Sequence, residues 1–199
     1  MLFTLIISFA VLGSSVAHAA GISPLEGLEA LRKGFAGIND FTAEITQEKQ
    51  VSIMKRVMKT SGTVKFRKPD QFMMEIRPPY SSRILLKDNV IEQSGGKGGS
   101  KSRIILPPEQ SLRQWFQKLA TPVSKLPDGV DIRASRSGQL YTLQIIPAKK
   151  GQVREMQIAY QADGTVRRIV IIEKNGDKAT IGFKKIRKNV GLSDKDFIL

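Results

Sequence analysis

The second half of the chain constrains the fold most, because it repeats a short alternating stretch followed by a turn signal. Successive side chains of a β-strand point to opposite faces, so Met156, Ile158 and Tyr160 share one face of such a stretch. Asp163-Gly164 and Asn175-Gly176 stand between stretches and favour tight hairpin turns. The predicted strands are residues 131–136, 139–147, 153–161, 165–174 and 178–187. Regularly spaced strands with tight turns predict a curved antiparallel sheet or barrel.

The first half contains further strands, and two of them surround a turn at Pro69-Asp70. Val64 and Phe66 share a face of the strand before this turn, and Phe72, Met74 and Ile76 share a face of the strand after it. Residues 41–51 also alternate, with Phe41, Ala43 and Ile45 on one face, and residues 49–59 continue them into a long hairpin. Shorter strands are predicted at 83–86, 89–93 and 103–106, with a flexible Gly- and Ser-rich loop at 94–102. The apolar faces form either ordinary core or the wall of a cavity for an apolar ligand.

Two segments have the pattern of helices. Ser23 and Glu26 fit a capping box around Pro24, which suits the first helical position. The residues that follow at helical spacing form an apolar stripe that should pack on the sheet: Leu25, Leu28, Leu31, Phe35 and Ile38. Residues 109–120 predict a second helix, which carries Leu112, Trp115, Phe116 and Leu119 on one side. This side serves either ordinary packing or a gate at the mouth of a cavity.

The N-terminus has the layout of a secretory signal peptide. Residues 2–12 form an apolar run that is too short to span a bilayer, and Ala17-His18-Ala19 follows as a cleavage pattern. We therefore expect a signal peptide at residues 1–20, cleavage near Ala19 or Ala20, and an exported mature domain of residues 21–199.

Composition narrows the chemistry that this domain can perform. The chain has no Cys, and its one His, His18, lies in the predicted signal peptide. This excludes His-based triads, Cys–His pairs and ordinary zinc sites from the mature domain, and we expect no metal or cofactor. The formal net charge of +14 favours anionic partners such as phospholipid headgroups or acidic glycolipid, unless it only makes a solvated basic surface. Export argues against nucleic acid as the partner.

Short motifs along the mature chain resemble those of one family. Residues 41–47, FTAEITQ, are similar to an F-x-A-x-F-x-Q opening. Gly62, a basic pair before Pro69, and then Phe72 are similar to a G-x-L-x-x-x-[KR]-P-x-x-F stretch. These motifs, the final meander and the closing Asp196-Phe197 resemble the periplasmic outer-membrane lipoprotein carriers of LolA type. The resemblance implies a mainly β fold, an unclosed, curved antiparallel β-barrel whose concave apolar face is covered by helices.

One departure from the family concerns its latch. In the family, an Arg directly before the Pro is thought to hold the lid closed through hydrogen bonds. Here that position is Lys68, with Arg67 one place earlier. The resemblance therefore implies Lys68, together with Arg67, as the lid latch, although Lys lacks the planar fork of Arg. We interpret the chain as a divergent member.

The resemblance also implies a binding site and partners. The cavity wall that would bind lipid is expected at Phe41, Ile45, Val64, Phe66, Phe72, Met74 and Ile76. The lid is expected at Leu112, Trp115 and Phe116. Flexible Met side chains suit a wall that must fit varied acyl chains. The expected partners are an acylated lipoprotein or lipid, an inner-membrane release or export complex and an outer-membrane acceptor, with the carrier acting as a monomer.

Three functions compete at this stage. The first is a carrier that shuttles lipoproteins or a related lipid from inner to outer membrane. The second is an accessory module of an envelope export or stress system that senses lipid or glycolipid, and the same fold would serve it. The third is an exported hydrolase using Asp, Ser or Lys, for which the sequence has neither a nucleophile elbow nor an S-x-x-K motif. We expect a binding protein and not an enzyme.

Overall fold

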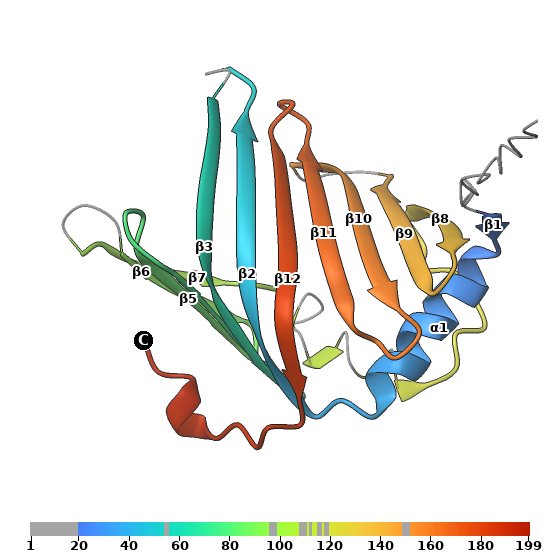
Figure 1. Ribbon diagram of the computed structural model, residues 1–199, viewed down its shortest axis with the longest axis horizontal. Coiled ribbons are helices and arrows are strands. Elements are labelled where there is room, and N and C mark those ends of the chain that lie inside the picture. Colours follow the sequence, from blue (N-terminus) through green and yellow to red (C-terminus); the bar gives the residue numbers. More distant parts are fainter. Residues whose placement is uncertain are drawn as a thin grey trace, which may run out of the picture.

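One antiparallel sheet makes up most of the described molecule. The computed structural model describes residues 20–53, 56–95, 99–107, 111, 113–114, 117, 120–148 and 152–199. Within them, twelve strands follow the order β1-β8-β9-β10-β11-β12-β2-β3-β4-β5-β6-β7 (Figure 1). The bounds are β1 (Ala20–Ile22), α1 (Pro24–Ala36), β2 (Asp40–Val51), β3 (Arg56–Arg67), β4 (Gln71–Ile76), β5 (Ser82–Lys87), β6 (Val90–Gly95), β7 (Lys101–Ile105), β8 (Val130–Ser137), β9 (Leu140–Pro147), β10 (Val153–Gln161), β11 (Val166–Glu173), β12 (Lys178–Lys188) and the 3-10 helix η2 (Asp194–Asp196). No helix in this part of the chain is long and apolar enough to cross a bilayer.

The predicted fold class is confirmed. The sheet bends strongly and its terminal strands, β1 and β7, do not pair with each other in the described chain, as in an unclosed barrel (Figure 1). The five strands predicted from the final meander correspond to β8–β12. The predicted flexible loop at 94–102 is shorter than expected, because Gly95 still belongs to β6 and β7 already begins at Lys101. The predicted signal peptide, up to residue 19, and the lid residues Leu112, Trp115 and Phe116 lie outside the described residues.

Local chemistry explains the two tight turns of the meander. Gly164 and Gly176 have φ values of 75° and 88°, a region that glycine enters at little steric cost. The Asp163 carboxylate accepts a hydrogen bond from the backbone N–H of Thr165 at 3.0 Å. The Asn175 side-chain oxygen accepts one from the N–H of Asp177 at 2.9 Å. An Asp or Asn side chain that accepts from the backbone N–H two residues later stabilises a turn. This is why the two dipeptides predicted the hairpins correctly.

Helix α1 begins at Pro24 as predicted, but the predicted capping box is wrong. The side chain of Ser23 makes no capping hydrogen bond, although Ser23 occupies the N-cap position. β1 ends one residue earlier, at Ile22, and pairs with β8. That pairing, which the sequence did not predict, leads the chain to the start of the helix, whose first backbone bond runs from Gly27 N–H to Ser23 C=O at 3.0 Å.

Two glycines let α1 approach the sheet closely. Gly27 and Gly34 are seven residues apart and therefore lie on the same helix face, with buried Leu31 between them. A Cβ atom on Gly34 would lie 2.2 Å from the backbone nitrogen of Gly164. The Tyr160 hydroxyl donates a hydrogen bond to the carbonyl of Gly27. Helix α1 thus packs directly on the half of the sheet that contains β8, β9 and β10 (Figure 1).

Adding one methyl group to this contact should loosen the helix. We expect Gly34→Ala to lower the free energy of unfolding by about 1–3 kcal/mol, because the clash is with backbone and cannot be relieved by a rotamer change. This loss must exceed the gain of about 1 kcal/mol that Ala brings in helix propensity. Chemical denaturation measures the difference. Gly37→Ala is the matched control, since a Cβ there meets nothing within 4 Å. A Gly34→Ala protein as stable as the parent would refute the close contact.

Candidate functional site

The predicted wall residues lie together on one face of three neighbouring strands. In the ladder between β2 and β3, Phe41 is opposite Phe66 and Ala43 is opposite Val64. In the ladder between β3 and β4, Phe66 is opposite Phe72, Val64 is opposite Met74 and Gly62 is opposite Ile76. Directly opposed residues share a face of the sheet. The structure therefore places all seven predicted side chains on one surface, which we call the apolar wall.

Burial varies along the apolar wall. Ile45 and Val64 are each only 2% exposed, and Phe66 is 4% exposed with its ring 5.3 Å from that of Phe41. Phe41, Phe72 and Met74 are only partly buried, although they pack on the same cluster. The wall thus has a closely packed centre and a margin of bulky side chains that are still partly accessible.

The apolar wall is wider than the sequence predicted. On one side, Ile181, Phe183 and Ile186 of β12 pack on the same cluster. On the other side, Leu86 is opposite Phe72 in the ladder between β4 and β5, and Ile91 is opposite Leu86 in the next ladder. The period-two pattern is hard to read at residues 84–86 because all three are apolar. Only the register of successive hairpins shows which of them share the face of Phe72.

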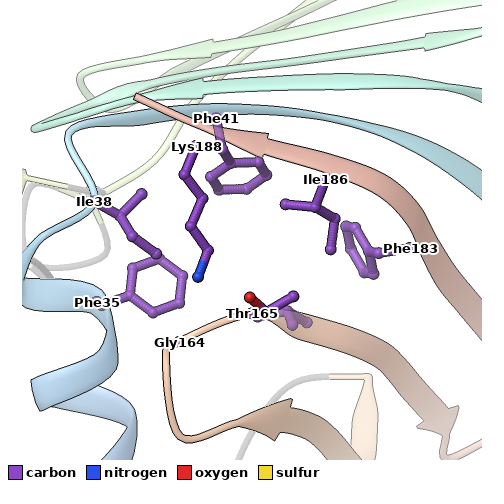
Figure 2. A pocket seen from close by; sticks show the side chains of 9 residues that line it. Phe35, Ile38, Phe41, Gly164, Thr165, Phe183, Ile186 and Lys188 are labelled. Atoms are coloured by element: carbon purple, nitrogen blue, oxygen red, sulfur yellow. The ribbon is translucent and has the colours of Figure 1, made fainter. Parts of the chain in front are cut away.

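A small hollow separates α1 from this wall. Its volume is about 10 Å³, and Phe35 and Ile38 line it from the helix side while Phe41, Phe183 and Ile186 line it from the sheet side (Figure 2). That volume holds about one water molecule and no acyl chain. The stem of Lys188 also lines the hollow, and its ammonium donates to the Asp163 carboxylate at 2.9 Å. Burial acts to raise the pKa of Asp163, but hydrogen bonds from Lys188 and Thr165 outweigh it and lower the pKa to about 2.

Lys68, the predicted latch residue, contacts α1. Its ammonium donates to the carbonyl of Phe35 at 2.7 Å and to that of Ala36 at 3.3 Å. These are terminal carbonyls of the helix, where a cation is favoured by the helix dipole. Partial burial lowers the pKa of the Lys68 ammonium. The three donors of a Lys suffice for this role because the acceptors are carbonyls and not a planar carboxylate.

Arg67, the other predicted latch residue, faces the opposite side of the sheet. Its guanidinium donates to the Gln71 side chain at 2.7 Å and to the Leu192 carbonyl at 3.2 Å, and it also binds the Asp194 carboxylate. The same group lies 5.6 Å from the centre of the Phe197 ring. Arg67 therefore holds residues 190–199 against the face of the sheet opposite the apolar wall, which we call the outer face. There Phe197 packs on Met73 and Leu85.

Arg113 makes a contact that the sequence did not predict. It lies within the predicted second helix, and Arg113, Gln114, Gln117 and Ala120 are helical in the described part of that segment. Its guanidinium donates to the carboxylate of Asp70 and, at 3.1 Å, to that of Asp88. Asp70 belongs to the turn between β3 and β4, and Asp88 belongs to the turn between β5 and β6. Arg113 thus ties the segment that contains the predicted lid to two turns at the edge of the wall.

The two carboxylates respond differently to this arrangement. Burial raises the pKa of Asp70, and the neighbouring Asp88 raises it further. Hydrogen bonds from Asp70 and Arg113 lower the pKa of the exposed Asp88. The Asp70 side chain is only 9% exposed, so loss of Arg113 would leave a buried carboxylate without this partner.

Comparisons with known proteins agree with this geometry. A family model described as outer membrane lipoprotein carrier protein LolA matches residues 36–199. No curated protein matches the sequence. Among solved structures, an uncharacterized conserved protein from Thermus thermophilus is similar with a TM-score of 0.52 and 12% identity, over 86% of this chain and 90% of that one.

Two further structures are similar at the same low level of identity. A crystal structure of MucB has a TM-score of 0.50 and 14% identity, over 87% of this chain and 62% of that one. A LolA superfamily protein from Nitrosomonas europaea has a TM-score of 0.46 and 12% identity, over 89% of this chain and 98% of that one. Likeness at these identities concerns the fold alone.

Removing the Arg113 side chain should loosen the segment that it holds. In Arg113→Ala we expect faster backbone hydrogen exchange at residues 111–120, together with a loss of stability of about 1–3 kcal/mol from the unpaired Asp70 carboxylate. Hydrogen-exchange mass spectrometry measures the first effect and chemical denaturation the second. Arg133→Ala is the control, since Arg133 is exposed and pairs with the exposed Asp131 at 3.6 Å. Unchanged exchange in residues 111–120 would show that Arg113 does not hold this segment.

Proposed function

The chain belongs to the family of the outer membrane lipoprotein carrier protein LolA, and we propose that it works as a carrier of that kind. In this proposal residues 1–20 direct export to the periplasm and are removed. The mature domain then binds the acyl chains of lipoproteins, or of a related lipid, on the apolar wall and shuttles them from inner to outer membrane. The observation that supports this most is the continuous apolar surface across β12, β2, β3 and β4.

The energetics of an acyl chain define what such a carrier must do. Each buried CH₂ group contributes about 0.8 kcal/mol, so a chain of about sixteen carbons is held in a membrane by roughly 13 kcal/mol. A carrier must offer apolar surface of similar value and still release its cargo to an acceptor. The partly buried Phe72 and Met74 provide such surface at the margin of the wall.

In this proposal loading requires the segment around Arg113 to move. The hollow beside α1 has a volume of only about 10 Å³, so an acyl chain cannot enter there while the helix stays in place. The hydrogen bonds of Arg113 to Asp70 and Asp88 are partly exposed, and such charged hydrogen bonds contribute about 1–3 kcal/mol each. Their sum is well below the roughly 13 kcal/mol of an acyl chain. In this proposal lipid displaces the segment around Arg113, while α1 stays packed on β8, β9 and β10.

In this account Arg113 is the latch of the second segment, and Lys68, the latch residue implied by the resemblance, fixes the end of α1. Lys68 holds α1 at its last carbonyls, and Arg113 holds the second segment through Asp70 and Asp88. Arg67 serves a different purpose, the attachment of residues 190–199 to the outer face. Leu112, Trp115 and Phe116 remain the proposed lid residues, because they neighbour Arg113 in the sequence.

A charge on the apolar wall should abolish lipid binding while the fold is kept. We expect protein purified from the periplasm to carry a lipid or an acylated peptide in native mass spectrometry, and Phe72→Glu to have lost it. Thr42→Glu is the matched control, because Thr42 is opposite Lys65 and Arg187 in the ladders on either side, so its side chain lies on the face away from the wall. Lipid retained by folded Phe72→Glu as well as by the parent would falsify the wall assignment.

Transfer between membranes separates the carrier from the sensing module. Vesicles with a labelled lipoprotein serve as donor, and unlabelled vesicles bearing the acceptor serve as target. A carrier should move the label in proportion to its own concentration, whereas capture without delivery would favour a lipid- or glycolipid-sensing function.

A further inference from the structure

The strand β7 leaves one end of the sheet open. It pairs with β6 and has no strand on its other side within the described chain. All five of its residues are exposed, including the apolar Ile104 and Ile105 at 55% and 68%. An edge strand with exposed apolar residues can accept a further strand through its unpaired backbone groups.

Both ends of β7 are fixed in place. At one end the Leu106 N–H donates to the Asn89 carbonyl at 2.7 Å, and the Asn89 side-chain amide donates to the Leu106 carbonyl at 2.9 Å. At the other end the Gly95 N–H donates to the Ser100 carbonyl at 3.1 Å, and the Ser100 hydroxyl donates to the Gly95 carbonyl at 2.8 Å. The edge is therefore held extended before any partner arrives, which lowers the entropy lost on binding.

The register shows which backbone groups face the open edge. In an antiparallel ladder, residues that bond to the neighbouring strand alternate with residues that point away from it. Asn89 bonds to Leu106 and Gly95 bonds to Ser100, so the even-numbered residues of β7 bond to β6. The N–H and C=O groups of Lys101, Arg103 and Ile105 consequently point outward and are ready to pair.

The side chains define the partner that would fit. Those of Lys101, Arg103 and Ile105 share the outer face, where Arg103 is opposite Glu92 at a distance of 3.9 Å between the charged atoms. Ile104 lies on the other face and is opposite Ile91, so it extends the apolar wall to the edge. A partner strand should therefore be acidic on one face and apolar on the other.

We propose that β7 is the docking edge for an extended acidic segment of a partner protein, which adds to the sheet as a further strand. Charge argues against a second copy of this chain as the occupant, because the chain has a formal charge of +14 and its own β7 would oppose Lys101 and Arg103. The proposal rests on the geometry of β7 and does not depend on lipid binding.

Amide exchange followed by NMR tests the edge directly. In the free protein the amides of Lys101, Arg103 and Ile105 exchange fast, while those of Ser102, Ile104 and Leu106 exchange slowly. A short peptide of alternating Glu and Val slows the three fast amides, and a peptide of alternating Lys and Val does not. The proposal is overturned if these three amides already exchange slowly in the free protein, because a second copy or another part of the chain would then cover the edge. It is equally overturned if the acidic peptide slows none of them.

A substitution that removes one outward donor completes the test. Arg103→Pro deletes an N–H that faces the open edge and leaves the bonds to β6 intact, a position that edge strands tolerate. We expect at least about a tenfold loss of peptide affinity, and a smaller loss in Arg103→Ala, which keeps the N–H. Arg83→Ala, a change on the outer face of β5, should bind like the parent, and all three variants should still carry lipid. Unchanged peptide binding by folded Arg103→Pro contradicts the proposal, and if that variant does not fold, the exchange experiment decides.

Discussion

The arrangement of the site depends on the contacts that the turn between β3 and β4 makes. From this one turn, the ammonium of Lys68 holds the terminal carbonyls of α1, and the carboxylate of Asp70 holds Arg113 of the second segment. The turn is itself fixed from both sides, because Lys68 N–H donates to the Asn39 carbonyl and Asp88 N–H donates to the Asp70 carbonyl. Helix α1 and the segment around Arg113 are thus both anchored at this one turn.

The two halves of the sheet are packed differently, which fits the proposed function. Under α1, Leu143 and Tyr160 are fully buried, and Gly27 and Gly34 bring the helix into direct contact with the strands. This half is a closely packed core of the ordinary kind. The other half carries the apolar wall, whose margin at Phe72 and Met74 is only partly buried. A protein that must open for a hydrophobic cargo needs such a division, because the core that keeps it folded cannot be the surface that it exposes.

The sequence predicted what depends on local periodicity and could not predict what depends on register. Alternation placed Val64, Phe66, Phe72 and Met74 on one face because side-chain direction follows directly from strand geometry. Lys68 was found through a short motif. In contrast, Arg113 meets Asp70 across 43 residues, and Arg67 meets Asp194 across 127 residues. Such pairs form only after the intervening strands are in register, so no local pattern indicates them.

The central claim of the proposal is that the acyl chain lies on the apolar wall and not on the outer face. The most direct measurement uses a lipid with a spin label near the end of its acyl chain and the methyl signals of the protein in solution. The account predicts paramagnetic broadening of Ile45, Val64, Met74 and Ile76, with Leu85, Leu192 and Leu199 on the outer face unaffected. Broadening of the outer-face methyl groups, with those of the wall unchanged, would contradict it.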